Sequence, residues 1–263
     1  MPEVIYGNLY DFPRYYDLLF GADWKAEIKF LTGCFEQFSK RPVKTLYEPA
    51  CGTGRLLDKL AKLGYQVAGN DLNPRAVEYC NQRLKRLGFP ETVEVGDMSD
   101  FRLKRPVHAA FNLINTVRHL PTEKSMESHL RCTGAALVKG GLYLLGLHLT
   151  PTEGPRMDGE SWTARRGKVT VNSRMWTKEL DLKGRNERLG IRFDVTTPTK
   201  KFCIEDEMNY RTYTARQMHR LLEKVGLFEV AGTFDFLYDL DDPIEVDETT
   251  EDVVYVLRRT TGS

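Results

Sequence analysis

The sequence predicts an α/β protein with a doubly wound, mostly parallel sheet of seven strands and an antiparallel β insertion. Two observations support this fold class. Between residues 43 and 149, short apolar runs alternate with amphipathic helical segments, which is the pattern of consecutive βαβ units. Between residues 150 and 212 this pattern stops and apolar residues recur at every second position, as expected of antiparallel strands with one buried face.

The composition is that of an ordinary globular protein. The 263 residues suffice for one large domain with a smaller insertion, and 41% of them are hydrophobic against 29% charged. The formal net charge of +1 gives no general attraction to nucleic acid or to an anionic membrane, so we expect neither as a partner. The five cysteines include no Cys-x-x-Cys pair, and we expect reduced thiols and no metal site. With no apparent signal sequence or membrane span, a cytoplasmic location is expected.

Two local basic clusters stand out against this neutral average. They consist of Arg83, Lys85 and Arg86, and of Arg165, Arg166 and Lys168. Neither is joined to an aromatic array of the kind that stacks nucleic acid bases. Both are therefore interpreted as solvated surface, with a contact site for a partner as the alternative.

Residues 1–40 are predicted to form an N-terminal helical cap. They are rich in aromatic side chains and lead into a helical pattern that includes Ile28, Leu31 and Phe35. A segment of this kind either covers a pocket or packs on the core of the domain.

The core is predicted to occupy residues 41–150 and 213–263. Its first strand ends at Glu48 and leads through a turn with two glycines into a helix that begins at Arg55 and ends at Gly64. Glycines let the backbone of such a turn approach a ligand closely, and the free N–H groups of the first helical turn face the same spot. We therefore place a binding site at this turn.

The next two strands each end at a carboxylate. Residues 65–70 are predicted to form the second strand, which delivers Asp71, and residues 92–95 the third, which delivers Asp97. Between them, the Asn73-Pro74 pair provides a helix cap and a proline for the first helical turn. Because the carboxyl ends of parallel strands share one edge of the sheet, we expect both carboxylates at the ligand-binding edge.

The first core segment continues with a fourth strand, a loop, a helix, a turn and a fifth strand. These are predicted at residues 108–114, at 115–120, from Pro121 or Thr122 onward, at 139–141 and at 142–149. The fifth strand is almost wholly apolar, as expected of a central strand covered on both faces. Asn115 and His148 fall at the carboxyl ends of the fourth and fifth strands.

Residues 151–212 are predicted to form the antiparallel insertion, with a hairpin turn at Lys183-Gly184. We expect this insertion to act as a lid over the active site or as an oligomer contact. The core pattern then resumes with a capping box formed by Thr214 and Gln217. The last two strands are predicted at residues 228–234 and 253–257, and the acidic loop between them is interpreted as solvated.

The glycine turn alone does not identify its ligand, because dinucleotide-binding enzymes use a similar turn. Their pattern has a third glycine three residues after the second, where this sequence has Leu57. A carboxylate just ahead of the turn, Glu48, also disfavours a pyrophosphate. Together with Asp71, 19 residues after Gly52, these features suit a ligand with an amine, a ribose diol and an adenine.

The run from Glu48 to Gly54, taken with these strand ends, resembles the glycine-rich motif of class I S-adenosylmethionine-dependent methyltransferases, which have a Rossmann-like sheet. The resemblance covers residues 43–149 closely and residues 213–258 more loosely. The loop at residues 115–120 and the segments Arg14–Asp17 and Arg211–Thr214 also resemble small-molecule methyltransferases that carry a β insertion after strand five.

The resemblance implies S-adenosyl-L-methionine as the cofactor. The residues implied to bind it are Tyr16, Glu48, Ala50, Gly52, Gly54, Asp71, Leu72, Asp97, Met98 and Asn115. Among these, the two glycines are implied to approach the methionine part and Asp71 to accept hydrogen bonds from the ribose. Leu72 and Met98 are implied to sandwich the adenine and Asp97 to hold its amino group. Asn115 is implied to line the sulfonium end. Two departures from the family pattern are Ala50, in place of its usual first glycine, and His108-Ala109-Ala110, where an acid often begins strand four.

For catalysis, His119 is the first candidate for a general base, because its loop follows strand four and imidazole titrates near neutral pH. A histidine bonded to backbone at a helix entry is the alternative. His148 and Tyr213 are further candidates for acceptor contacts. Arg211 is a candidate to bind a carboxylate or phosphate of the acceptor, with a structural salt bridge as the alternative.

We therefore predict an enzyme that transfers a methyl group to a nitrogen or oxygen of a small-molecule acceptor, as a monomer or a homodimer. Two alternatives remain open from the sequence. One is an NAD(P)-dependent oxidoreductase, and the other is a non-catalytic regulatory protein that binds S-adenosylmethionine.

Overall fold

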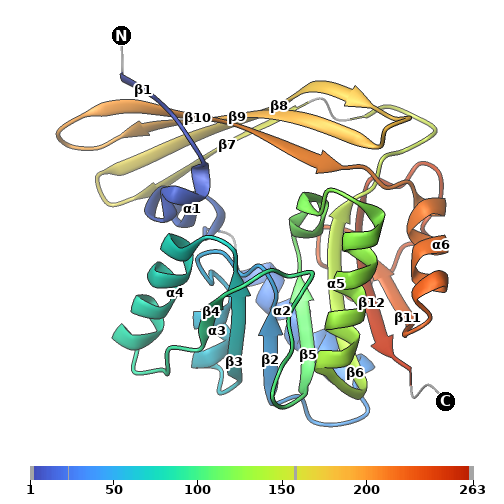
Figure 1. The fold of residues 1–263 in the computed structure, drawn as a ribbon. Helices are drawn as coiled ribbons and strands as arrows, with labels where there is room; N and C mark the ends of the chain where they lie inside the picture. The colour runs from blue at the N-terminus through green and yellow to red at the C-terminus, as the bar shows by residue number, and fades with distance from the viewer. Residues whose placement is uncertain (1–2, 23, 157–158, 261–263) are drawn as a thin grey trace.

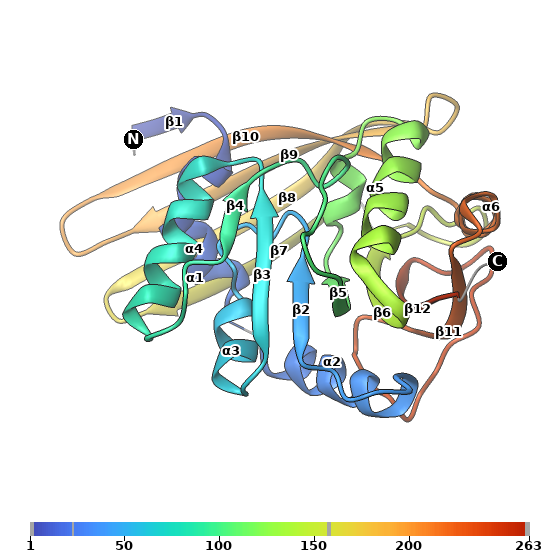
Figure 2. The same ribbon diagram turned by 60° about the horizontal axis from the view of Figure 1, so that its bottom comes forward.

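The computed structural model describes residues 3–22, 24–156 and 159–260, and Figures 1 and 2 show its arrangement. Within these residues the strands form two separate sheets, one of seven strands and one of five. The seven-stranded core sheet is covered by helices on both faces. The five-stranded sheet, called the insertion sheet below, lies across the carboxyl ends of the central core strands (Figure 1).

The core sheet confirms the predicted fold class. Its strand order is β11-β12-β6-β5-β2-β3-β4, and every neighbouring pair is parallel except the two pairs that involve β12. The strands are β2 (Thr45–Glu48), β3 (Gln66–Asp71), β4 (Val93–Val95), β5 (Val107–Asn112), β6 (Leu137–His148), β11 (Phe228–Phe234) and β12 (Asp252–Arg259). Ligands of such sheets bind at the carboxyl edge where the strand order reverses, which here lies at β2 and β5.

Alternate residues of the core strands face two different helical layers. Leu46 of β2 packs with one layer and its neighbour Tyr47 with the other, as the period of two requires. The first layer contains α2 (Trp24–Phe38), α3 (Leu57–Lys62) and α4 (Pro74–Arg86), and the second contains α5 (Glu123–Ala136) and α6 (Ala215–Val225). Both faces of the sheet are therefore buried, which accounts for the apolar strand sequences.

Local capping signals place several helix ends. The Asn73 side chain accepts hydrogen bonds from the N–H groups of Arg75 and Ala76 at the start of α4. Thr214 and Gln217 form the expected capping box of α6. The helix after the glycine turn begins at Leu57, two residues later than expected, because residues 52–56 form turns.

The insertion sheet has the order β1-β10-β9-β8-β7. Its strands are β1 (Glu3–Tyr6), β7 (Gly159–Arg166), β8 (Val169–Asp181), β9 (Asn186–Thr196) and β10 (Lys201–Arg211). Strands β7 to β10 pair antiparallel, whereas β1 runs parallel to β10. The N-terminal segment is therefore not purely helical. Its strand joins the insertion sheet, and η1 (Leu9–Asp11) and α1 (Pro13–Phe20) pack beneath that sheet.

One predicted feature of the core is wrong. Residues 139–141 do not form a turn between helix and strand, because β6 already begins at Leu137 and runs through them. Gly140 has a φ of 74°, and the pairing of β5 with β6 shifts register between Val107 and Ala109. The glycine pair thus makes a bulge, which the sequence pattern does not separate from a turn.

No helix within the described residues is long and apolar enough to cross a membrane. The same residues contain no group of three or more His, Cys, Asp or Glu side chains that would hold a metal ion.

Candidate active site at the carboxyl edge

The glycine turn after β2 has a left-handed backbone at three positions. Ala50, Gly52 and Gly54 have φ values of 49°, 54° and 63°. A Cβ added to Gly52 would meet no atom within 4 Å, whereas one added to Gly54 would overlap the Sγ of Cys80 on α4. Gly52 therefore leaves space above the turn, while Gly54 lets the turn pack against a helix.

The position of Ala50 explains why the related motif has glycine there. A side chain with a Cβ in the left-handed region costs roughly 1–2 kcal/mol, which glycine avoids. In this chain the Ala50 N–H donates to the Asn70 side chain at 3.2 Å. The departure from the family motif is thus small in volume but carries backbone strain.

Asp71 connects the ends of the first two core strands. One carboxylate oxygen accepts from the Gly52 N–H at 2.7 Å and the other from the Asn73 N–H at 2.8 Å. Burial raises the pKa of the Asp71 carboxyl, and these two backbone hydrogen bonds oppose the rise. The carboxylate is therefore fixed beside the glycine turn, with lone pairs left over for further donors.

Glu48 at the end of β2 is buried, and its Oε2 atom has no hydrogen-bond partner among the described residues. Burial raises the pKa of this carboxyl, and the Arg55 guanidinium opposes the rise. Arg55 itself is already paired with the buried Glu27. A buried acceptor without a partner, close to the open space at Gly52, fits a ligand that brings a positively charged donor such as an ammonium group.

The residues predicted to surround an adenine follow the carboxyl ends of β3 and β4. Met98 is buried, whereas Leu72 is 66% exposed. The Asp97 carboxylate accepts from the Ser99 N–H at 2.7 Å and the Ser99 hydroxyl at 2.8 Å. No sequence pattern singled out His129, whose ring nitrogens form hydrogen bonds with the Met98 carbonyl at 2.8 Å and the Tyr143 hydroxyl at 2.7 Å. Burial lowers the pKa of His129 to about 4, so this imidazole is a neutral support for the Met98 loop.

An aromatic cluster covers the carboxyl edge of the core sheet on the side that faces the insertion sheet. Tyr10 lies 5.2 Å from Tyr16 between ring centroids and shares a hydrogen bond of 2.8 Å with Nε2 of His119. His119 also packs edge-on against Tyr210 of the insertion sheet at 4.8 Å. Burial lowers the pKa of His119 to about 4, and neighbouring Arg118 adds to the effect. The predicted base is therefore neutral at pH 7, but its Nε2 is already bonded to Tyr10, a partner that the sequence did not reveal.

A cleft of about 150 Å³ lies between the core edge and the insertion sheet, and we call it the acceptor cleft. Of the predicted site residues, Asn115 and His148 line it. Its other polar lining comprises Arg118, Thr150, Arg156, Glu160, Trp176, Thr177, Glu187, Tyr210 and Glu251. A non-catalytic regulatory protein is expected to have its acceptor site closed or filled by side chains, so a cleft at this position disfavours that alternative.

His148 in this cleft is oriented by two neighbours. Its Nδ1 lies 2.5 Å from the Asp252 carboxylate on the adjacent strand β12. Its backbone N–H donates to the Asn115 side chain at 2.7 Å. Nε2 has no partner among the described residues, so it is the nitrogen free to accept a proton. Asp252, 104 residues away in sequence, was missed because strand pairing alone brings it to His148.

Charge in the cleft is mostly negative. Arg118 is paired with Glu187 at 2.6 Å, which leaves neither side chain unbalanced. Glu160 and Glu251 also line the cleft and form no ion pair within the described residues, and neither does Arg156, so that three carboxylates face two guanidinium groups in the lining. A cationic acceptor is therefore favoured over an anionic one.

Two predicted acceptor residues lie outside the cleft. Tyr213 is fully buried in the core, its hydroxyl has no partner among the described residues, and burial raises its pKa to about 12. Arg211 donates to the Pro121 carbonyl at 3.3 Å and forms no salt bridge within the described residues. The structure thus places both side chains away from the acceptor cleft: Tyr213 packs with the layer of α5 and α6, and Arg211 contacts a backbone carbonyl rather than an acid.

Residues 47–141 match the family described as "Methyltransferase domain", a stretch that contains the glycine turn, Asp71, Asp97 and Asn115. A curated relative is the dTDP-3-amino-3,4,6-trideoxy-alpha-D-glucopyranose N,N-dimethyltransferase of Streptomyces venezuelae. It is 26% identical over 206 residues, which cover 76% of this chain and 80% of the relative.

Two solved structures share the fold over nearly the whole chain. One is an S-adenosylmethionine-dependent methyltransferase from Clostridium acetobutylicum, with a TM-score of 0.76 at 18% identity, covering 96% of this chain and 100% of that one. The other is an amino pentose methyltransferase from Micromonospora echinaspora, with a TM-score of 0.71 at 19% identity, covering 97% and 98%. The matched domain, on this shared fold, identifies the chain as a class I S-adenosylmethionine-dependent methyltransferase.

Proposed function

We propose that this enzyme methylates the amine nitrogen of a small-molecule acceptor of the amino sugar type, held in the acceptor cleft. The observation that carries the proposal is the oriented His148 beside the unpaired carboxylates Glu160 and Glu251. Carboxylates favour a protonated amine on arrival, and Nε2 of His148, which has no partner among the described residues, is placed to take its proton. The curated relative, named as an N,N-dimethyltransferase of an amino sugar, supports the same acceptor class.

The cofactor residues are proposed to act as the resemblance implies. Glu48 accepts from the ammonium group of the methionine part, for which its Oε2 atom is available, and Asp71 accepts from the ribose hydroxyls. Tyr16, Ala50, Gly52, Gly54 and Asn115 are proposed to surround the methionine part, and Leu72, Asp97 and Met98 the adenine. When bound, S-adenosylmethionine supplies an activated methyl group on a positively charged sulfur.

The protein's own contribution is then alignment and removal of a proton. A protonated amine has no lone pair, so it cannot attack until a base has taken its proton. His148 is proposed to accept this proton at Nε2, while Asp252 holds Nδ1–H and stabilises the imidazolium that forms. A base of this kind contributes roughly 10² to 10⁴-fold, and alignment in a closed site up to about 7–11 kcal/mol.

His119 is proposed to position the acceptor site rather than to take the proton. Its Nε2 is occupied by the Tyr10 hydroxyl, and it does not belong to the lining of the acceptor cleft. The Tyr10–His119 pair joins the N-terminal segment to the loop after β5 and so closes the cofactor side of the site. This assignment replaces the sequence prediction of His119 as the first candidate base.

The insertion sheet is proposed to form the roof of the acceptor cleft and thereby to keep water out. Residues of β7 to β10 line the cleft, which supports the role of a lid. A monomer or homodimer remains our proposal for the assembly, and sedimentation equilibrium of the purified protein distinguishes the two.

Methyl transfer to two matched acceptors tests the proposed function. The first is a dTDP-linked 3-amino sugar, and the second is the same sugar with a hydroxyl in place of the amine. We expect mass spectrometry to detect one or two added methyl groups on the amino sugar and none on the hydroxyl sugar. Methylation of the hydroxyl sugar alone would contradict the choice of nitrogen. Cofactor binding without transfer to any of a panel of small amines would contradict the acceptor class.

A further inference from the structure

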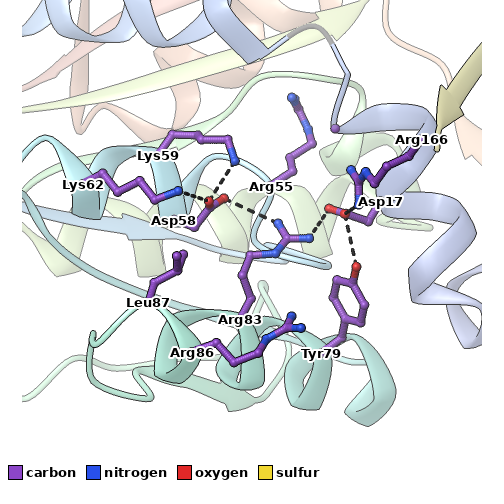
Figure 3. A pocket seen from close by; sticks show the side chains of 11 residues that line it. Asp17, Arg55, Asp58, Lys59, Lys62, Tyr79, Arg83, Arg86, Leu87 and Arg166 are labelled. Atoms are coloured by element: carbon purple, nitrogen blue, oxygen red, sulfur yellow. Dashed lines mark hydrogen bonds and ion pairs between the residues drawn. The ribbon is translucent and has the colours of Figure 1, made fainter.

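A second cleft, which we call the basic cleft, lies between α1, α3, α4 and the end of β7 (Figure 3). It has a volume of about 490 Å³ and shares no lining residue with the acceptor cleft. Six cationic side chains line it against two carboxylates, Asp17 and Asp58; the cations are Arg55, Lys59, Lys62, Arg83, Arg86 and Arg166. Arg55 is paired with Glu27 outside the lining, but the other five cations still exceed the two carboxylates, in a chain whose net charge is only +1.

The two basic clusters of the sequence meet in this cleft. Arg86 of α4 and Arg166 of β7 are 80 residues apart, yet both line it. Their neighbours in sequence do not: Lys85 lies 3.7 Å from Glu91, and the Arg165 side chain donates to the Gly167 carbonyl at 3.0 Å. Our interpretation from the sequence, solvated surface, therefore holds for Lys85 and Arg165. It does not explain why Arg83, Arg86 and Arg166 line the same cleft.

Two buried carboxylates, Asp58 and Asp17, hold cationic side chains in place, and we call each carboxylate with its cations a cation centre. Asp58 binds Lys59 at 2.8 Å and Lys62 at 3.6 Å, and Asp17 binds Arg166 at 3.2 Å. Both carboxylates are only 2% exposed. In Figure 3, four cationic side chains from α3, α4 and β7 converge on these two acids, whereas Arg55 and Arg86 point away from them; the four are Lys59, Lys62, Arg83 and Arg166. The carboxylates thus offset the mutual repulsion of the cationic side chains and keep them close together.

Arg83 joins the two centres. Its guanidinium pairs with Asp17 and lies 3.5 Å from Asp58, and it stacks over the Tyr79 ring at 5.1 Å. The outward-facing cations retain donors that the two carboxylates do not use, since a guanidinium has five N–H groups and an ammonium three. Leu87, 40% exposed, adds an apolar wall.

We propose that the basic cleft binds the diphosphate group of a small organic ligand of nucleotide size. Two adjacent cation centres match two linked phosphoryl groups, and arginine forks suit phosphate oxygens. The volume falls within the range of small-molecule pockets, roughly 300–1,000 Å³, and is too small for a protein or a duplex. Because its lining is separate from the acceptor cleft, this site does not depend on the proposed function, and methyl transfer is not its readout.

Isothermal titration with inorganic pyrophosphate and with a nucleoside diphosphate tests the site, at ionic strength held constant by added NaCl. The test variant is the double substitution Arg86→Gln and Arg166→Gln. Its matched control is Lys85→Gln with Arg165→Gln, which removes the same charge from the same two elements outside the cleft. Far-UV circular dichroism and thermal unfolding show that each variant is folded.

We expect the wild type and the control to bind alike, and the test variant to bind pyrophosphate at least about tenfold more weakly, since two charge-assisted contacts are lost. Tighter binding of the nucleoside diphosphate than of pyrophosphate supports the full proposal when the test variant loses this difference and the control keeps it, since a nucleoside diphosphate that binds at the acceptor cleft would be unaffected by the test substitutions. If pyrophosphate binds and the nucleoside adds nothing, the organic part of the proposal is wrong. Equal weakening in both double variants, or no binding by the wild type, overturns the site.

Discussion

Replacing Glu48 with glutamine tests how the cofactor site recognises its ligand. The substitution keeps the shape of the side chain and removes its charge. In the folded protein Glu48 is buried, burial raises its pKa, and its Oε2 atom lacks a partner among the described residues. If the ammonium group of S-adenosylmethionine supplies that partner, the contact is a hydrogen bond between two charged groups. Such bonds contribute about 1.5–3 kcal/mol, so we expect the cofactor to bind about 10- to 150-fold more weakly.

The same substitution has the opposite effect on the free protein. A carboxyl whose folded pKa is raised above its unfolded value favours unfolding once the pH exceeds the unfolded value. Glu48→Gln removes this penalty, so the variant without ligand should unfold at a higher urea concentration at pH 7. Gain of stability together with loss of affinity separates a binding carboxylate from a structural one.

Calorimetric titration with two ligands provides the decisive comparison. S-Adenosylmethionine carries the ammonium group, whereas 5′-methylthioadenosine lacks the amino acid part and serves as the matched control. We expect Glu48→Gln to weaken the first and to leave the second within about twofold, less than 0.5 kcal/mol. Equal weakening of both ligands, or unchanged binding of S-adenosylmethionine, would show that Glu48 does not contact the amino group.

Three further predictions follow from the site and its supports. Asp252→Asn should lower kcat about 10²-fold or more while leaving S-adenosylmethionine affinity unchanged, because His148 then lacks its carboxylate partner; an unchanged kcat in a stopped assay would exclude the pair. His129 has its pKa lowered from 6.5 to about 4, so unfolding free energy should fall by up to about 3 kcal/mol as pH drops between those values, and His129→Gln should flatten that slope in urea titrations. Gly54→Ala should lower thermal stability more than Gly52→Ala, since only the first new Cβ overlaps Cys80; the reverse order of melting temperatures would contradict the packing described for the turn.

Features set by neighbouring residues were predictable from the sequence. The helix after Asn73-Pro74 begins as expected, because an asparagine cap and a first-turn proline act through bonds within one helical turn. The core strands also lie close to their predicted positions, because apolar strands bounded by glycine and polar residues have few alternatives. Glu48, Asp71 and Asn115 were found at the sheet edge because a parallel sheet dictates where its strands end.

Features that depend on distant pairing were not predictable in this way. Strand β1 pairs with β10, about 200 residues later, and nothing in its four residues specifies that partner. Asp252 reaches His148 only through the antiparallel register of β12 with β6. The burial of Tyr213 was missed because a tyrosine after a strand is compatible with either a site or a core. The bulge at Gly140 was missed because a glycine pair marks a turn as readily as a bulge.

Asp17 links parts of the molecule that have been described separately. It accepts a hydrogen bond of 3.4 Å from the hydroxyl of Thr53, inside the glycine turn, while also holding Arg83 and Arg166 in the basic cleft. If the basic cleft binds an anion as proposed, an anion that draws these arginines toward itself would free lone pairs of Asp17, and the Thr53 contact would carry this change to the glycine turn. Thermodynamic linkage makes such an effect mutual: whatever factor the anion imposes on the affinity for S-adenosylmethionine, the methyl donor imposes on the affinity for the anion. Under the proposal for the basic cleft, one buried carboxylate would therefore couple binding of the methyl donor to a second ligand that takes no part in the chemistry.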